Sequence, residues 1–211
     1  MKKYKVTIAL SLLLLLVADI HAQQPGANQK LSGKLSLGTR ITGSLFNGDD
    51  EGTPGIGLGG QTRVQLSNRV NSEWFADFIT SSIGDVASRN DYHIGWSFMF
   101  YTGSKNDFTN FLQPYILAGH CFDYTRVEQD HNTANFKDRV SMAMQAGAGT
   151  HFNVTPLFDF SLSAQYMLHL GKDIHTAVVN NDAVITKTNS SKPEGHLLMT
   201  LSINYKIANL W

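Results

Sequence analysis

The sequence has almost no cysteine and no excess of either charge. Cys121 is the only cysteine among 211 residues, so an intramolecular disulfide and a cluster of cysteine metal ligands are both excluded. The 17 basic and 17 acidic side chains cancel at pH 7. The charge therefore gives no reason to expect nucleic acid as a partner.

Long apolar runs are also missing after the amino-terminal segment, which excludes a transmembrane helix there. The one apolar run, residues 6–17, follows three lysines and precedes Ala22, a small residue at a possible cleavage point. This pattern is typical of a secretory signal peptide, and a retained helical anchor is the weaker alternative. We expect residues 1–22 to be removed and residues 23–211 to form one domain. Loss of the three lysines and Asp19 leaves 14 basic and 16 acidic side chains.

What the chain has instead is an apolar residue at every second position. The pattern is clearest in residues 196–211, where small or polar residues separate the members of one apolar series: Leu197, Met199, Leu201, Ile203, Tyr205, Ile207 and Trp211. Strict alternation predicts a β-strand with two different environments. The stretch is longer than most soluble strands and long enough to cross a bilayer at a tilt.

The same alternation predicts eight strands, at residues 31–46, 56–67, 72–82, 91–101, 112–124, 139–152, 158–170 and 196–211. The strand at 112–124 is ambiguous, because Tyr115 and Leu117 favour one phase while Phe122 and Tyr124 favour the other. A β-bulge near Gly119 would reconcile the two phases.

The connections between these strands alternate in kind. Short ones are expected at residues 68–71, 102–111 and 153–157, and longer polar ones at 47–55, 83–90, 125–138 and 171–193. An even strand number with short turns on one side and long loops on the other predicts an all-β, eight-stranded antiparallel transmembrane up-and-down β-barrel. Closed hydrogen bonding would stabilise such a chain without disulfides. Within residues 171–193, two apolar patches around Asn180 predict a β-hairpin that either caps the barrel or offers an edge to a partner.

A soluble sandwich or lipocalin-like barrel would also alternate. Three features favour a membrane barrel: charges in mid-strand, an aromatic carboxyl end, and aromatic residues gathered near strand ends, as at membrane interfaces.

The sequence resembles the small eight-stranded outer-membrane barrels, the OmpA/OmpX-like group. The signal peptide, the eight amphipathic strands, the stretch QPYILAG at residues 113–119 and the carboxyl end carry the resemblance. The end of the chain resembles the terminal signal read by the barrel-assembly machinery, through Ile203, Tyr205, Ile207 and Trp211. Asn209 departs from that signal at a usually apolar position. The resemblance implies an integral protein of the bacterial outer membrane, with membrane lipid and the assembly machinery as partners and no cofactor.

Charged residues on the less apolar face are expected to point into the lumen, whose width side chains just fill in an eight-stranded barrel. They are Arg40, Arg63, Glu73, Asp77 and Asp159, together with Lys34 and Lys206. The parity of the hairpin permits Arg63 to lie opposite Asp77. The near balance of signs favours a salt-bridged plug over an ion path.

Two histidines flank the longest loop on one face, His169 and His196. They would bind a metal only with a further ligand, such as Asp173 or Asp182, and two histidines alone are more often polar rim residues. No metal site is therefore predicted. Ser97 follows His93 on one strand, but their spacing does not distinguish them from ordinary lumen residues.

These observations predict a non-enzymatic scaffold that supports the envelope or presents loops 47–55, 125–138 and 171–193 to an extracellular partner. A narrow pore, a lipid-modifying outer-membrane enzyme and a soluble secreted binding protein are the alternatives.

Overall fold

The structure is a computed structural model that describes residues 32–46, 54–103, 110–171, 173–179, 182–188 and 195–211. The expected signal peptide and most of the 47–55 loop lie outside these residues. Within them no helix is long and apolar enough to cross a membrane.

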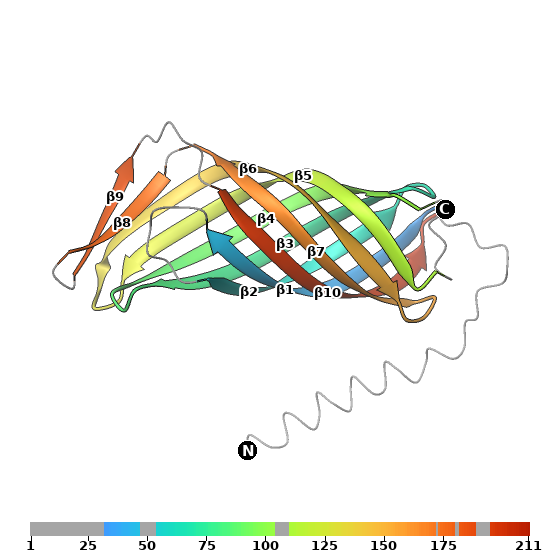
Figure 1. Cartoon of the computed structure of the whole chain (residues 1–211), viewed down its shortest axis with the longest axis horizontal. Helices are drawn as coiled ribbons and strands as arrows, with labels where there is room; N and C mark the ends of the chain where they lie inside the picture. Colours follow the sequence, from blue (N-terminus) through green and yellow to red (C-terminus); the bar gives the residue numbers. More distant parts are fainter. Residues whose placement is uncertain (1–31, 47–53, 104–109, 172, 180–181, 189–194) are drawn as a thin grey trace, which may run out of the picture. The chain divides into compact units, whose positions relative to one another are not determined.

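Ten strands make up the described fold: β1 (Lys34–Phe46), β2 (Gly55–Gln65), β3 (Val70–Ile83), β4 (Ala87–Tyr101), β5 (Leu112–Gln129), β6 (Asn132–Asn153), β7 (Phe158–Leu170), β8 (Asp173–Val179), β9 (Asp182–Thr188) and β10 (Gly195–Asn209). Eight of them close into one antiparallel barrel in the order β1, β10, β7, β6, β5, β4, β3, β2, as Figure 1 shows. The predicted eight-stranded up-and-down barrel is confirmed. The remaining two, β8 and β9, pair only with each other.

The register of the barrel closes after a displacement of ten residues. Following the backbone partners from Ser36 once around all eight strands leads back to Phe46 on β1. An even displacement keeps every inward-facing series inward around the whole circumference, because side chains alternate with period two.

The two ends of the barrel differ. β1 begins beside the end of β10, where Lys34 is the partner of Asn209, and the turns at residues 66–69 and 154–157 lie at this end, called here the termini end. The β8–β9 hairpin lies at the opposite end, called here the hairpin end (Figure 1). The turns at residues 84–86 and 130–131 also lie there.

Two predicted long loops are wrong, because the strands continue through them. β5 and β6 pair as far as Gln129 and Asn132, with one register shift next to Glu128, so residues 125–138 are mostly strand. Likewise β3 reaches Ile83 and β4 begins at Ala87. The charged residues in these extensions resemble a loop in composition, yet they alternate as in any strand.

The predicted bulge near Gly119 is also wrong. Gly119 keeps an unbroken register with Ser97 on β4 and with Gln145 on β6. Tyr115 and Leu117 face the lumen, where they cluster with two residues of β4, Met99 and Tyr101. The two apparent phases arise because this part of the lumen is itself apolar.

Apolar side chains cover the outside of the barrel. Val140 is 76% exposed, Leu58 68% and Ile94 64%, and aromatic rings pair on the same outer surface, as in Phe78–Tyr92 at 4.9 Å. A continuous apolar outer band of this kind needs a nonaqueous environment. The outer residues of β10 include Ile203 and Ile207, with Trp211 beyond the strand also exposed, while Tyr205 stacks on Phe158 at 4.7 Å.

The predicted hairpin in the longest loop is confirmed as β8 and β9. Its buried apolar residues, Ile174, Ala183 and Ile185, form one cluster with residues of β3, β4, β5 and the β3–β4 turn: Ile83, Ala87, Val127 and Val86. Lys187 also donates a hydrogen bond from Nζ to the carbonyl of Asp138, at 3.0 Å. The hairpin therefore packs as a cap on the extended strands.

Candidate functional site

The lumen near the termini end holds a network of paired charges. Arg63 contacts Glu73 Oε2 through Nε at 2.7 Å and Asp159 Oδ1 through Nη1 at 3.0 Å. Lys206 Nζ lies 3.3 Å from Asp159 Oδ2. Arg40 joins the network through Glu73 Oε1 at 3.4 Å. All five side chains are buried, so each depends on these partners to offset the loss of water.

The pairing inside this network differs from the predicted one. Arg63 lies opposite Glu73, whereas Asp77 contacts Arg40 Nε at 3.1 Å. The difference arises in the turn, which occupies residues 66–69 and lies two residues earlier than predicted. Lys34, also predicted for the lumen, is buried and donates to Asn209 Oδ1 at 2.9 Å.

Inward-facing glycines leave space for the polar side chains of neighbouring strands. A side chain at Gly59 would collide with the carboxylate of Asp77, and one at Gly38 with the amide of Asn204. Asn204 in turn donates to Asp159 Oδ1 at 2.9 Å. A cavity lined by Arg63, Asp159 and Lys206 has a volume of only about 10 Å³, which is roughly the room that one water molecule needs.

An apolar layer separates this network from the rest of the lumen. It consists of Phe75, Ile79, Cys121, Ala143, Met167 and Leu198, all buried. Its place follows from β10, where the inward series runs from His196 through Leu198 to Thr200, and Thr200 accepts a hydrogen bond from Arg40. The layer closes the network on the side of the hairpin end except on β3, where Asp77 lies between Phe75 and Ile79 and is the backbone partner of His93.

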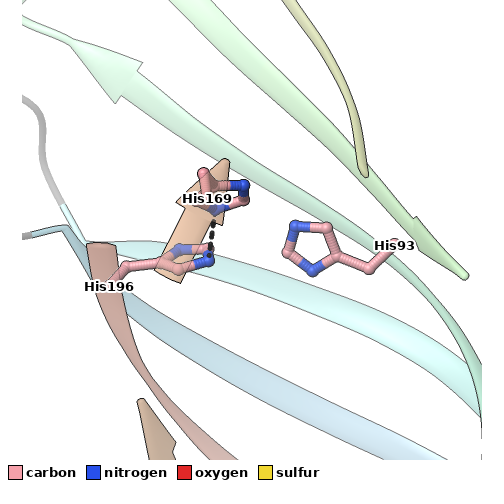
Figure 2. A group of neighbouring side chains, drawn as sticks. All are labelled: His93, His169 and His196. Atoms are coloured by element: carbon pink, nitrogen blue, oxygen red, sulfur yellow. Dashed lines mark hydrogen bonds between the residues drawn. The ribbon is translucent and has the colours of Figure 1, made fainter. Parts of the chain in front are cut away.

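Beyond the apolar layer, three histidines from three strands face one another, as Figure 2 shows. They are His93 on β4, His169 on β7 and His196 on β10, and none is more than 1% exposed. His169 Nε2 lies 3.1 Å from His196 Nε2, and the ring of His93 stands edge-on to that of His196 at 5.5 Å between centroids. We call these residues with Asp123 the histidine cluster.

Asp123 on β5 ties the cluster together. Its Oδ1 lies 3.2 Å from His93 Nε2 and its Oδ2 lies 3.1 Å from His169 Nδ1. Arg139 contacts the same carboxylate through Nη2 at 3.1 Å. On the far side, Ser44 Oγ lies 2.8 Å from His196 Nδ1.

A second ion pair lies next to the cluster on β4. Arg89 Nε contacts Asp91 Oδ2 at 3.1 Å, and Thr125 donates a hydrogen bond to Asp91 Oδ1 at 2.6 Å. Asp77, the backbone partner of His93, adds a third carboxylate that contacts Arg40 at 3.1 Å. The groups around the histidines are thus three carboxylates and three guanidiniums, in balance.

The structure brings the predicted pair His169 and His196 into contact. The third member is His93, which the sequence did not single out as a ligand, whereas the side chains of Asp173 and Asp182 lie outside the described part. Ser97 points into the lumen four residues from His93 and accepts a hydrogen bond from Gln145 at 2.7 Å.

The barrel is similar to solved structures of bacterial membrane proteins. Neisserial surface protein A aligns with a TM-score of 0.59 at 13% identity, over 82% of this chain and 97% of that one. The chain has the fold of the small eight-stranded outer-membrane β-barrels. A major outer membrane protein from Thermus thermophilus aligns at 0.55 and 8% identity, over 82% and 99%. The outer membrane protein AlkL aligns at 0.52 and 13% identity, over 88% and 96%.

No family model and no curated protein sequence matches the chain. At these identities the likeness to an outer-membrane barrel concerns the fold, and function has to be argued from the lumen and the surface.

Proposed function

We propose that the protein is an integral outer-membrane barrel with a closed lumen, a non-enzymatic scaffold that holds its hairpin end at the cell surface. The paired charges inside the apolar wall carry this proposal. A barrel of this kind is apolar toward lipid and polar inside. The extended β5–β6 strands and the β8–β9 hairpin lie at the hairpin end, and longer extensions of this kind are typical of the extracellular side.

The outer surface supports insertion in a bilayer. On β6 the outward residues from Val140 to Phe152 are apolar except Thr150, and beyond them the outward Asp138 marks the start of the polar extension. On β10, Ile203, Ile207 and the exposed Trp211 belong to the outer surface. We expect this end of the chain to be read by the assembly machinery during insertion.

The filled lumen argues against a pore. An open path would have to cross the Arg63 network, the apolar layer and the histidine cluster in turn. Separating Arg63 from Glu73 and Asp159 would leave buried charges without partners, which costs about 3–5 kcal/mol. This free-energy cost of opening keeps the closed arrangement dominant in the population.

The burial of the histidines argues against an enzyme. Ser44 Oγ contacts His196 at 2.8 Å, a distance suited to an activated nucleophile. Both side chains, however, are 0% exposed. A substrate carbonyl has to come within about 3–3.5 Å of the nucleophile, and no surface of this serine is open to a substrate of that size.

The hairpin end is the part of the scaffold that would meet an extracellular partner. It includes the β8–β9 cap and the extended β5–β6 hairpin, where Arg126 contacts Glu128 at 3.0 Å and lies over the ring of Phe136. This extension takes the place of the loop predicted at residues 125–138.

Two measurements on the refolded protein test the proposal. An unboiled sample should migrate faster than a boiled one on a gel, because a closed barrel resists detergent. Planar bilayers containing the folded protein should show no regular conductance steps. Uniform steps would replace the scaffold with a pore, and a protein recovered in the soluble fraction without a gel shift would overturn the membrane assignment.

A further inference from the structure

We propose that His93, His169 and His196 form a Zn²⁺-binding site inside the barrel, on the hairpin side of the apolar layer, with Asp123 as an outer partner of the rings. The site is independent of whether the lumen conducts. Three imidazoles with the fourth position left to water are a ligand set that zinc takes in proteins.

The distances suit a tetrahedral ion. Two nitrogens that each lie about 2.05 Å from zinc at the tetrahedral angle are about 3.3 Å apart. His169 Nε2 and His196 Nε2 are 3.1 Å apart, and one nitrogen from each of the three histidines falls within 4.8 Å of the others. Only His93 has to move inward appreciably. Its Nε2 lies 3.2 Å from Asp123 Oδ1, whereas its Nδ1 has no hydrogen-bond partner among the described residues to lose.

The outer partners of the rings leave the converging nitrogens available. His169 presents Nδ1 to Asp123 at 3.1 Å, and His196 presents Nδ1 to Ser44 at 2.8 Å. The Nε2 atoms of His169 and His196 are then directed at each other. Metal-binding histidines usually have their second nitrogen fixed in this way by a carboxylate or another oxygen.

Without a metal the two Nε2 atoms can meet at 3.1 Å only if one proton lies between them. Because Asp123 accepts from Nδ1–H of His169, that proton belongs to His196, and Ser44 then donates to His196 Nδ1. When zinc binds, it takes the place of the shared proton. The His196 proton moves to Nδ1 and Ser44 becomes the acceptor, so no net proton need be released.

The donor atoms select the ion. Imidazole nitrogen favours divalent first-row transition ions, whereas calcium and magnesium require oxygen ligands. Cys121 lies one inward position from Asp123 but packs in the apolar layer, with Sγ 3.6 Å from Met167 Sδ. The site thus offers three nitrogen donors, with zinc as the best match.

The surrounding charges moderate the affinity. Arg139 and Arg89 are already balanced by Asp123 and Asp91, so an added ion brings two uncompensated positive charges into a buried region. Zinc should therefore bind more tightly when one guanidinium is removed. A cluster that serves only as a hydrogen-bonded filling would show no such gain, which makes Arg139→Gln an informative variant.

The test is a zinc titration of the full barrel, refolded into detergent micelles after chelator treatment, in competition with a chromophoric chelator. We expect one equivalent of Zn²⁺ per chain. The combined variant His169→Asn/His196→Gln should lose more than the roughly 10–100-fold that removal of an outer partner costs. His151→Asn is the matched control, because His151 is buried at the termini side next to Arg63 and Tyr101.

Cobalt provides a second readout, since Co²⁺ in a tetrahedral nitrogen–oxygen site absorbs strongly in the visible range. Heat modifiability establishes that each variant is folded. If the histidine variant does not fold, Ser44→Ala decides instead, with an expected loss of about tenfold in zinc affinity. No saturable binding by the folded wild type, or equal binding by it and a folded variant, would overturn the site.

Discussion

The two polar regions of the lumen differ in how their buried polar side chains are paired. Near the termini end, Arg63 meets Glu73 and Asp159, so opposite charges offset one another. Near the hairpin end, three imidazoles face each other beside Asp123, whose charge Arg139 already offsets. The first region is filled by ion pairs alone, whereas the second also contains converging ring nitrogens.

The apolar layer keeps these regions distinct. Phe75 belongs to the layer and also lies under the guanidinium of Arg40, at 4.5 Å. Met167 precedes His169 by two residues on β7, so one strand contributes to both the layer and the histidine cluster. The difference between the regions therefore follows from which inward positions carry polar side chains along the same strands.

The largest expected effect is the loss of Arg63. Arg63→Met leaves Glu73 and Asp159 buried without this partner, and should lower the free energy of unfolding by about 3–5 kcal/mol. Urea unfolding of the protein in lipid vesicles measures the change. The half-buried surface pair Arg126–Glu128 gives the control, because Arg126→Gln should cost no more than about 1 kcal/mol.

A compensated variant sharpens this prediction. Combining Arg63→Met with Glu73→Gln and Asp159→Asn removes both stranded charges and should recover most of the lost stability. If Arg63→Met alone costs as little as Arg126→Gln, the network does not hold the termini side of the lumen together.

A somewhat smaller effect is expected from the apolar layer. Met167 is fully buried in the layer, and Met167→Ala should destabilise the barrel by about 2–5 kcal/mol by removing its contacts and leaving a cavity. The same unfolding assay measures it. Met144→Ala is the control on the neighbouring strand, since Met144 is 61% exposed toward the outside. Equal losses of unfolding free energy in both variants would show that the apolar layer contributes no more than the outer surface.

The fold was predictable because period-two alternation survives in every barrel strand. Strand β7 has the predicted bounds, and the even number of barrel strands allows β1 and β10 to pair antiparallel. The alternation gave no information about where a strand leaves the membrane. Arg126 and Glu128 are outward residues of a continuing strand, and their charges resemble those of a loop.

The histidine cluster was only half predictable, for a related reason. Parity places His169, His196 and His93 on inward faces, but their heights depend on the turns and on the displacement around the barrel. The turn after β2 differs from the prediction by two residues, and the β5–β6 turn lies inside a predicted loop. In the structure His93 is the backbone partner of Asp123, and that pairing was the missing signal.

Zinc should raise the free energy of unfolding of the barrel through the histidine cluster and not through the Arg63 network. At a free zinc concentration 100 times the dissociation constant, binding to the native state alone adds about 2.7 kcal/mol to the free energy of unfolding. The wild type and His151→Asn should both show this gain, while His169→Asn/His196→Gln should not. A gain in the last variant would place the zinc outside the histidine cluster.

The smallest expected effect concerns access through the cap. Ile185 packs in the apolar cluster between the β8–β9 hairpin and the extended strands. Ile185→Ser should weaken that contact locally and cost the whole barrel only about 1 kcal/mol, because the hairpin pairs with no barrel strand and can open by itself. Zinc would then enter and leave faster at an unchanged affinity, as stopped-flow mixing with a chelator can measure. Thr186→Ser on the exposed face of β9 is the control, and equal zinc rates in both variants would show that the ion does not pass the cap.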